Sequence, residues 1–148
     1  MGVHGEDAVT VLVVDDEPAV GKALKRMLAK EGMQTLSVRS GERALEVLIA
    51  QSVQLLVTDM RMPEMDGFEL LEHVKQRWPS LPVVLLTSYG TVPLAVEAMR
   101  RGATDFLLKP FERGEIVFTL RKALGRRADL SEIPAPAVVA ESDRPPGI

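Results

Sequence analysis

The fold is decided by the stretch TVLVVDDEP at residues 10–18, where an apolar run leads into two aspartates, a glutamate and a proline. A run this apolar is typical of a strand in a parallel sheet whose two faces are both covered by helices. Sheets of this kind bind ligands in a crevice at the carboxyl ends of their strands. We therefore expect Asp15 and Asp16 to lie at a ligand-binding edge.

The same alternation of apolar run and helical period continues along the chain. Strands are predicted at residues 10–14, 34–38, 53–58, 82–87 and 104–108, and the first, third and fourth are nearly all apolar, as central strands should be. Between them, helix starts are indicated by Pro18, by Asp66 with Glu69, and by Thr91. The second helix is expected to bury Ala44, Leu45, Leu48 and Ile49. The predicted class is α/β, a (βα)5 doubly wound parallel five-stranded sheet in a flavodoxin-like three-layer sandwich.

Length and composition indicate one domain of ordinary size. The chain has 148 residues, of which 46% are hydrophobic, with a net charge of -3 and no cysteine. The basic residues form no dense stripe, so direct binding to nucleic acid is not expected. A signal peptide and a membrane-spanning run of roughly 20 apolar residues are both absent from the sequence, so we expect a cytoplasmic protein without membrane contact.

The sequence divides into three parts. Residues 1–8 are predicted to be a flexible N-terminus, and residues 9–127 the functional domain. Residues 128–148 carry four prolines and no sustained period, which predicts a flexible tail or the stub of a linker.

Two further charged residues follow predicted strands. Asp59 comes after the third strand, and Lys109 comes after the fifth and precedes Pro110. The pair Asp15 and Asp16 could equally be a helix cap, but a third carboxylate favours a site, because packed carboxylates repel unless a cation binds or a pKa rises. Mg²⁺ prefers oxygen ligands and completes its shell with phosphate oxygens. The sequence therefore predicts an acidic Mg²⁺ pocket suited to phosphoryl chemistry, with Asp59 placed for attack on phosphorus.

Two members of this set have simpler alternatives. Lys109 could be an ordinary surface lysine, although its apolar neighbours can hold its stem and Pro110 allows a cis peptide that would aim its ammonium group. Thr87, at the end of the fourth strand, could use its hydroxyl only to cap the following turn. Beside the other residues it can instead donate a hydrogen bond to a phosphoryl oxygen.

Four motifs stand in order along the chain at the spacing of such a fold. They are VLVVDDE at 11–17, TDMRMPEMDG at 58–67, LLTSYG at 85–90 and GATDFLLKPF at 102–111. Together they resemble the receiver domains of bacterial response regulators, a CheY-like family, over about residues 9–125. The stretch 89–111 looks most like the receivers of NtrC-type regulators, which are sigma-54 activators.

The resemblance implies a role for each residue of the set. Asp59 would accept a phosphoryl group from a phosphohistidine of a sensor histidine kinase, Lys109 would pair with the phosphoryl oxygens, and Thr87 would turn toward them. Mg²⁺ would be held by Asp15, Asp16, Asp59 and the backbone carbonyl of Arg61. The domain would promote only its own phosphorylation and dephosphorylation, and so would not be an enzyme with a separate substrate.

The resemblance also implies a switch and partners. Movement of Thr87 would free space that Phe106 of the fifth strand can fill, although an aromatic residue on a strand is usually core. The fourth helix, fifth strand and fifth helix would then face a downstream effector, an output domain or a second copy. Salt bridges across such a homodimer and plain solvated charge are the two alternatives for Arg100, Arg101, Asp105 and Arg121.

Three rival functions have less support in the sequence. A phosphohydrolase would need a second carboxylate near Asp59, which is followed by Met60 and Arg61. A flavodoxin-like electron carrier would need a phosphate loop rich in glycine, serine or threonine, which residues 16–19 do not offer. The alternative that stays open is a phosphate-independent receiver-like docking module, although such a module would be expected to have lost a member of the charged set.

Overall fold

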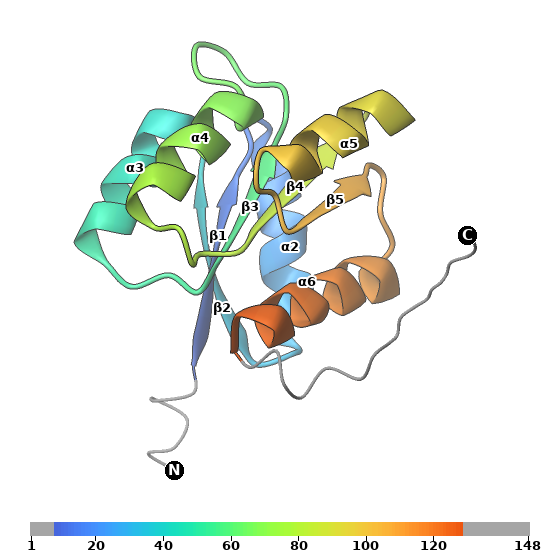
Figure 1. Ribbon diagram of the computed structural model, residues 1–148. Coiled ribbons are helices and arrows are strands. Elements are labelled where there is room, and N and C mark those ends of the chain that lie inside the picture. Colours follow the sequence, from blue (N-terminus) through green and yellow to red (C-terminus); the bar gives the residue numbers. More distant parts are fainter. Residues whose placement is uncertain (1–7, 129–148) are drawn as a thin grey trace.

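Five strands alternate with five helices in residues 8–128, which are the residues that this computed structural model describes (Figure 1). The strands are β1 (Val9–Val14), β2 (Met33–Val38), β3 (Leu55–Asp59), β4 (Val83–Thr87) and β5 (Asp105–Leu108). The helices are α2 (Pro18–Ala29), α3 (Gly41–Ala50), α4 (Gly67–Arg77), α5 (Val92–Arg100) and α6 (Arg113–Ala128). No helix in this part of the chain is long and apolar enough to cross a membrane. Residues 1–7 and 129–148, and with them most of both predicted flexible ends, lie outside the described residues.

All strand pairs are parallel, and the order in the sheet is β2-β1-β3-β4-β5. The predicted (βα)5 fold is thus confirmed, with β1, β3 and β4 as the three central strands. Helices α3, α4 and α5 pack on one face of the sheet, and α2 and α6 pack on the other (Figure 1). The outcome is the three-layer sandwich expected from strict alternation of strand and helix.

Alternation of side chains along each strand divides the interior into two cores. In β1, Leu12 and Val14 face the core under α3 and α4, whereas Val11 and Val13 face the core under α2 and α6. All of these side chains are fully buried. Because both faces are covered, β1 is apolar from Val11 to Val14, and its sequence shows an unbroken apolar run there.

The helix starts follow the predicted capping residues. Asp66 and Glu69 form a capping box at α4, in which each side chain accepts a hydrogen bond from the other residue's backbone N–H. At α5, the Thr91 hydroxyl accepts the N–H of Leu94. These bonds satisfy N–H groups that the first turn of a helix leaves free, and they fix where each helix leaves its loop.

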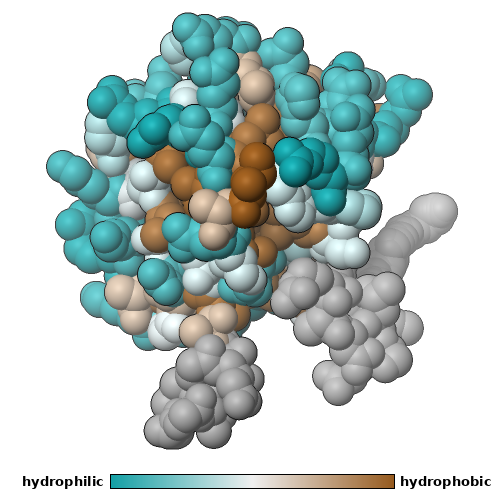
Figure 2. Space-filling view, turned by 90° about the vertical axis from the view of Figure 1, so that its left-hand side faces the viewer, coloured by the Kyte–Doolittle hydropathy of each residue, from teal (hydrophilic) through white to brown (hydrophobic). Residues whose placement is uncertain are grey.

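Two local predictions were wrong. Parallel pairing of β3 with β1 begins at Leu55, so Val53 packs against the core from the preceding loop instead of joining the strand. Ile49 is 62% exposed, because α3 buries a narrower stripe than its apolar residues cover. Figure 2 looks at the side of the molecule that carries α3 and α4, and a band of hydrophobic side chains runs there between hydrophilic ones.

Candidate functional site

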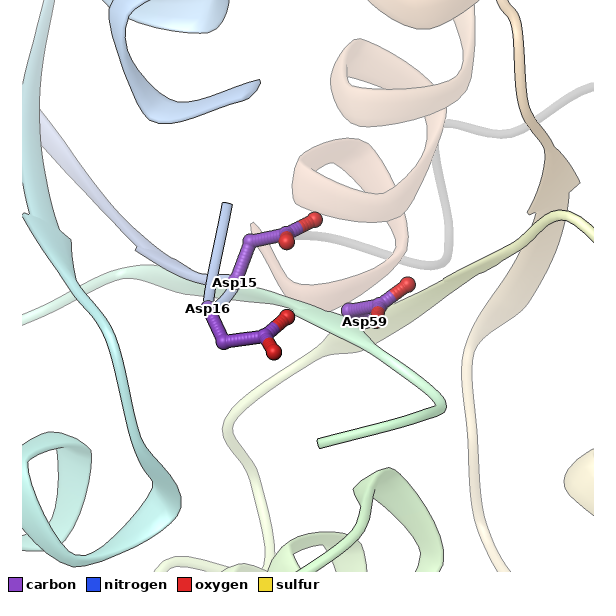
Figure 3. A group of neighbouring side chains, drawn as sticks. All are labelled: Asp15, Asp16 and Asp59. Atoms are coloured by element: carbon purple, nitrogen blue, oxygen red, sulfur yellow. The ribbon is translucent and has the colours of Figure 1, made fainter. Parts of the chain in front are cut away.

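Three aspartates gather at the carboxyl ends of β1 and β3 (Figure 3). Val14 lies opposite Thr58 in the paired strands, so Asp15 and Asp59, each the next residue, leave the sheet at the same level. Asp16 follows on the loop to α2. Each aspartate offers a carboxylate oxygen within 4.8 Å of the others. The predicted meeting of the three carboxylates is observed.

Lys109 reaches this group from the end of β5, across the intervening strand β4. Its Nζ lies 2.9 Å from a carboxylate oxygen of Asp15 and 2.9 Å from one of Asp59. Its side chain is only 14% exposed, so it is not an ordinary surface lysine. The Lys109–Pro110 peptide is cis, and the Lys109 N–H donates to the carbonyl oxygen of Thr87.

The electrostatics of the site follow from burial and from these two contacts. Burial raises the pKa of Asp59, and the neighbouring Asp15 raises it further, although the hydrogen bond from Lys109 acts in the opposite direction. Burial tends to lower the pKa of Lys109, but its hydrogen bonds to Asp15 and Asp59 outweigh burial, so this pKa is raised. The lysine therefore stays charged, and one cation stands among three carboxylates.

Asp15 also has a local structural role. Its Oδ1 accepts the N–H of Glu17, and its side chain is almost fully buried. Helix α2 begins at Pro18 with Glu17 as its N-cap, and no side chain makes the capping bond there. The helix-cap alternative for Asp16 is therefore not observed, and this carboxylate stays half-exposed beside the other two.

The donor set fits a hard divalent cation. The three clustered ligands are carboxylates, and Mg²⁺ is bound by oxygens together with water and phosphate oxygens. Lys109 provides one positive charge against three negative ones, so charge balance also favours a cation. A second positive centre here would be able to accept the oxygens of a phosphoryl group.

Thr87 is buried at the end of β4, and its hydroxyl accepts the N–H of Tyr89 at 3.0 Å. This bond is the turn-capping role considered above as the simpler alternative. Thr87 also lines a hollow of about 790 Å³ between the loops that follow β3 and β4, together with Met60, Arg61, Phe68, Tyr89 and Leu94. There is thus room beside Thr87 for its side chain to turn.

Phe106 is half-buried in β5 and lines a separate hollow of about 410 Å³ against α5, with Val92, Ala95 and Leu108. Its ring also packs against the core under α5. The charged residues expected near this face all pair within the chain. The pairs are Arg100 and Arg101 with Glu97, Arg121 with Glu31, and Asp105 with Lys122.

Two residues that shape the site, Gly67 and Glu17, stand in the quoted motifs, but the sequence analysis predicted no role for either of them. A methyl group on Gly67 would lie 2.6 Å from the carbonyl oxygen of Asp59, so the start of α4 rests directly on the loop that follows Asp59. Glu17 places a carboxylate oxygen 3.9 Å from the Nζ of Lys109. Gly67 could have been found from its place after Asp66, because glycine at a helix start permits close approach to another backbone.

A parallel (βα)5 sandwich with three carboxylates and one lysine at the carboxyl ends of its strands defines the class of receiver domains. Comparison with known proteins gives the family. The sequence profile of the response regulator receiver domain matches residues 11–121. The chain therefore belongs to the response regulator receiver family, as its motifs predicted.

Individual relatives agree with this assignment. The chain is 46% identical over 120 residues to the response regulator protein FleR of Pseudomonas aeruginosa, a match that covers 80% of this chain and 25% of FleR. It is 40% identical over 114 residues to the DNA-binding transcriptional regulator NtrC of Escherichia coli, covering 77% of this chain and 24% of NtrC. The likeness to NtrC-type receivers is thus confirmed. The chain spans about a quarter of the length of these two relatives.

Solved structures show the same fold. The receiver domain of NtrX from Brucella abortus superposes with a TM-score of 0.74 at 33% identity, over 78% of this chain and 98% of that one. The chemotaxis protein CheY4 of Vibrio cholerae gives a TM-score of 0.75 at 26% identity, over 78% of this chain and 98% of CheY4.

Proposed function

We propose that Asp59 is the phosphoacceptor of this receiver and takes its phosphoryl group from a phosphohistidine of a sensor histidine kinase. The observation that carries the proposal is the position of Lys109, whose Nζ contacts Asp15 and Asp59 at equal distances of 2.9 Å inside a group of three carboxylates. Such a cation can neutralise charge on a phosphoryl group attached to Asp59.

The transfer is an in-line displacement. An Asp59 carboxylate oxygen forms a bond to phosphorus while the bond between phosphorus and the imidazole nitrogen of the kinase breaks. The electron pair of that bond stays on the nitrogen, and the product on Asp59 is an acyl phosphate. Water later forms a bond to phosphorus and displaces the Asp59 carboxylate, which resets the domain. The chain thus promotes its own phosphorylation and dephosphorylation and turns over no separate substrate.

Each of the surrounding residues supports one part of this reaction. Asp15, Asp16, Asp59 and the backbone carbonyl of Arg61 would hold Mg²⁺, which supplies positive charge to the equatorial phosphoryl oxygens. Lys109 would shift from pairing with Asp59 to pairing with a phosphoryl oxygen. Thr87 would give up its hydrogen bond with the N–H of Tyr89, and its hydroxyl would donate a hydrogen bond to another phosphoryl oxygen. Phe106 would then move toward the space that Thr87 has left.

The test is the mass of the intact protein after incubation with Mg²⁺ and phosphoramidate, a small phosphoryl donor that needs no kinase. We expect a gain of one phosphoryl group that disappears in Asp59→Asn and when a chelator removes Mg²⁺. Asp105→Asn, which changes an aspartate outside the site, should still be phosphorylated. Absence of any gain in the wild-type protein would favour the phosphate-independent docking module.

We further propose that α5, β5 and α6 form the surface that contacts an output domain, a downstream effector or a second copy in a homodimer. The support is a set of exposed apolar side chains, namely Val92, Val96, Met99, Leu108 and Phe118. The charges beside them already pair within the chain, so apolar contact is the better candidate for association. Light scattering with and without phosphoramidate tests the homodimer, and Val96→Asp should abolish any association that phosphorylation induces. We place this signalling in the cytoplasm, where kinases phosphorylated by ATP act.

A further inference from the structure

One contact joins the loop after Asp59 to the loop after Thr87. The guanidinium of Arg61 lies 4.4 Å from the centre of the Tyr89 ring, within the range of a cation–π interaction. Tyr89 is 61% exposed, and Arg61 is exposed as well. Among the residues whose side chains are described, which are 8–125, Arg61 makes no ion pair with a carboxylate.

Tyr89 is held from two sides. Its ring stacks against Arg61, and its backbone N–H donates to the Thr87 hydroxyl at 3.0 Å. Tyr89 therefore has two contacts: its backbone holds the Thr87 hydroxyl, which is expected to turn toward a phosphoryl group, and its ring is covered by Arg61. All three residues line the hollow of about 790 Å³ between the two loops.

Arg61 is also close to the position where negative charge would appear. It follows Asp59 by two residues, and its backbone N–H donates a hydrogen bond that lowers the pKa of the Asp59 carboxyl. A phosphoryl group carries close to two negative charges and three acceptor oxygens, which match the planar donors of a guanidinium. An exposed cation–π contact is weaker than such charge-assisted hydrogen bonds. The Arg61 guanidinium would therefore bind more strongly to the phosphoryl oxygens than to the Tyr89 ring.

We propose that Arg61 and Tyr89 form a latch on the resting state, and that Arg61 exchanges the Tyr89 ring for the phosphoryl oxygens once Asp59 is phosphorylated. Loss of the stack loosens the loop that holds the Thr87 hydroxyl, so that Thr87 can turn. The inference rests on the proposed function of Asp59. It adds that the side chain of Arg61 is a positioning residue that senses the new charge and acts through Tyr89.

The sequence offers a direct test, because Tyr89 is the only tyrosine of the chain. Incorporation of fluorotyrosine into the full chain therefore gives a single fluorine NMR resonance that reports the surroundings of this ring. Arg61→Gln should shift the resonance in the unphosphorylated protein. The matched control is Arg77→Gln, which removes a similar stack, with the guanidinium 4.9 Å from the Trp78 ring, in another part of the molecule. The control should leave the resonance in place.

Phosphorylation should move the wild-type resonance toward the position that Arg61→Gln shows at rest, and should change the variant's resonance much less. Intact mass, measured on the same samples, separates the two proposals. A wild-type protein that gains its phosphoryl group while the resonance stays in place would overturn the latch and leave the function of Asp59 standing. A wild-type protein that gains no phosphoryl group would overturn both, whereas an unchanged resting resonance in Arg61→Gln would overturn the latch alone.

Discussion

At the scale of single residues, the site depends on one cation placed among carboxylates. Lys109 is largely buried, and each of its two short contacts is to an aspartate that would otherwise be desolvated next to another negative charge. Without the ammonium group, the negative charges of Asp15 and Asp59 would repel each other with no cation between them. In the proposed reaction the same ammonium group would have a second role, because it could neutralise negative charge that develops on a phosphoryl group at Asp59.

Lys109→Met should slow phosphorylation by phosphoramidate by about 100-fold at saturating Mg²⁺, the usual scale for loss of one donor aimed at developing charge. Methionine keeps the length and apolar stem of the side chain, so packing against the core is largely preserved. The measurement is the initial rate of mass gain. Lys122→Met, which changes an exposed lysine paired with Asp105, should react at the wild-type rate. Equal rates in the wild type and the Lys109 variant would remove Lys109 from the chemistry.

At the scale of elements, the start of α4 is fixed by backbone contact with the loop that follows Asp59. The N–H of Gly67 donates to the carbonyl oxygen of Met60, and the space for a side chain at this position is filled by the backbone of Asp59 and Met60. The helix therefore cannot shift without moving Asp59. Through this backbone contact, the amphipathic helix α4 helps to hold the loop that follows Asp59 in position.

Gly67→Ala should lower the free energy of unfolding by about 1–3 kcal/mol, the range for forcing extra atoms into a packed interior. The added methyl group would lie 2.6 Å from a carbonyl oxygen, and backbone atoms cannot move aside as a flexible side chain could. Urea unfolding followed by the fluorescence of Trp78, the only tryptophan, measures the change.

The matched control for this substitution is Gly114→Ala in the first turn of α6. A side chain there meets no atom within 4 Å, and alanine favours a helix over glycine by up to about 1 kcal/mol. The control should thus be neutral or slightly stabilising. A Gly67 variant as stable as the control would show that α4 can leave the Asp59 loop at little cost.

Helices α2 and α6 are joined by Glu31, which follows α2 and pairs with Arg121 at 2.7 Å and Arg113 at 3.0 Å. The hydrogen bond from Arg121 and the charges of both arginines lower the pKa of Glu31. A lowered pKa in the folded state means that the pair stabilises the protein fully above the pKa of an unfolded glutamate. That stabilisation is lost as the pH falls through the lowered pKa.

Glu31→Gln should therefore lower the midpoint of urea unfolding at neutral pH, and the difference from wild type should shrink as the pH is lowered through the depressed pKa of Glu31. Added salt should shrink it too, because the pair is partly exposed. Glu46→Gln serves as the control, since Glu46 pairs with Arg43 in the same helix. A difference that stays constant with pH would mean that Glu31 acts through packing and not through its charge.

The sequence predicted the helices and strands better than it predicted the contacts between side chains. The apolar runs around Val13 and Val57 identify central strands because both sides of each strand are buried. Ile49 was misplaced, because an apolar stripe on a helix does not show how much of it the sheet covers. The stack of Arg61 on Tyr89 joins residues from separate loops, and local periodicity carries no information on such a contact.

For the site too, the positions of the residues could be predicted from the sequence, whereas their contacts could not. The convergence of Asp15, Asp16 and Asp59 could be predicted because parallel strands present their carboxyl ends at one edge of the sheet. The resting partner of the Thr87 hydroxyl could not be predicted, because a hydroxyl at this position can either cap the following turn or donate to a phosphoryl oxygen, and the loop conformation decides the first. Patterns of residue type therefore give the position of the site, whereas its resting state depends on the geometry of the loops.

At the scale of the whole molecule, both cores draw on helices and strands from one end of the described part of the chain to the other. The core under α2 and α6 extends to Ala123, and the sheet begins at Val9. Ile116 and Leu120 of α6 are fully buried against β3, β4 and β5, so this helix is part of the fold and not an appendage. We therefore propose that residues 9–128 fold as one unit, one residue longer than the predicted domain.

A chain of residues 9–128 should consequently unfold in urea with the same midpoint and the same slope as the full chain, since the slope follows the surface that unfolding exposes. A chain of residues 9–112 gives the contrast. It lacks α6, so Val11, Val84 and Leu86 would lose part of their cover, and each fully buried side chain left exposed costs about 1.5–3 kcal/mol. This shorter chain should show no cooperative transition. A lower midpoint for residues 9–128 than for the full chain would mean that the flanking segments contribute to stability, and would place the boundary of the folding unit outside the described residues.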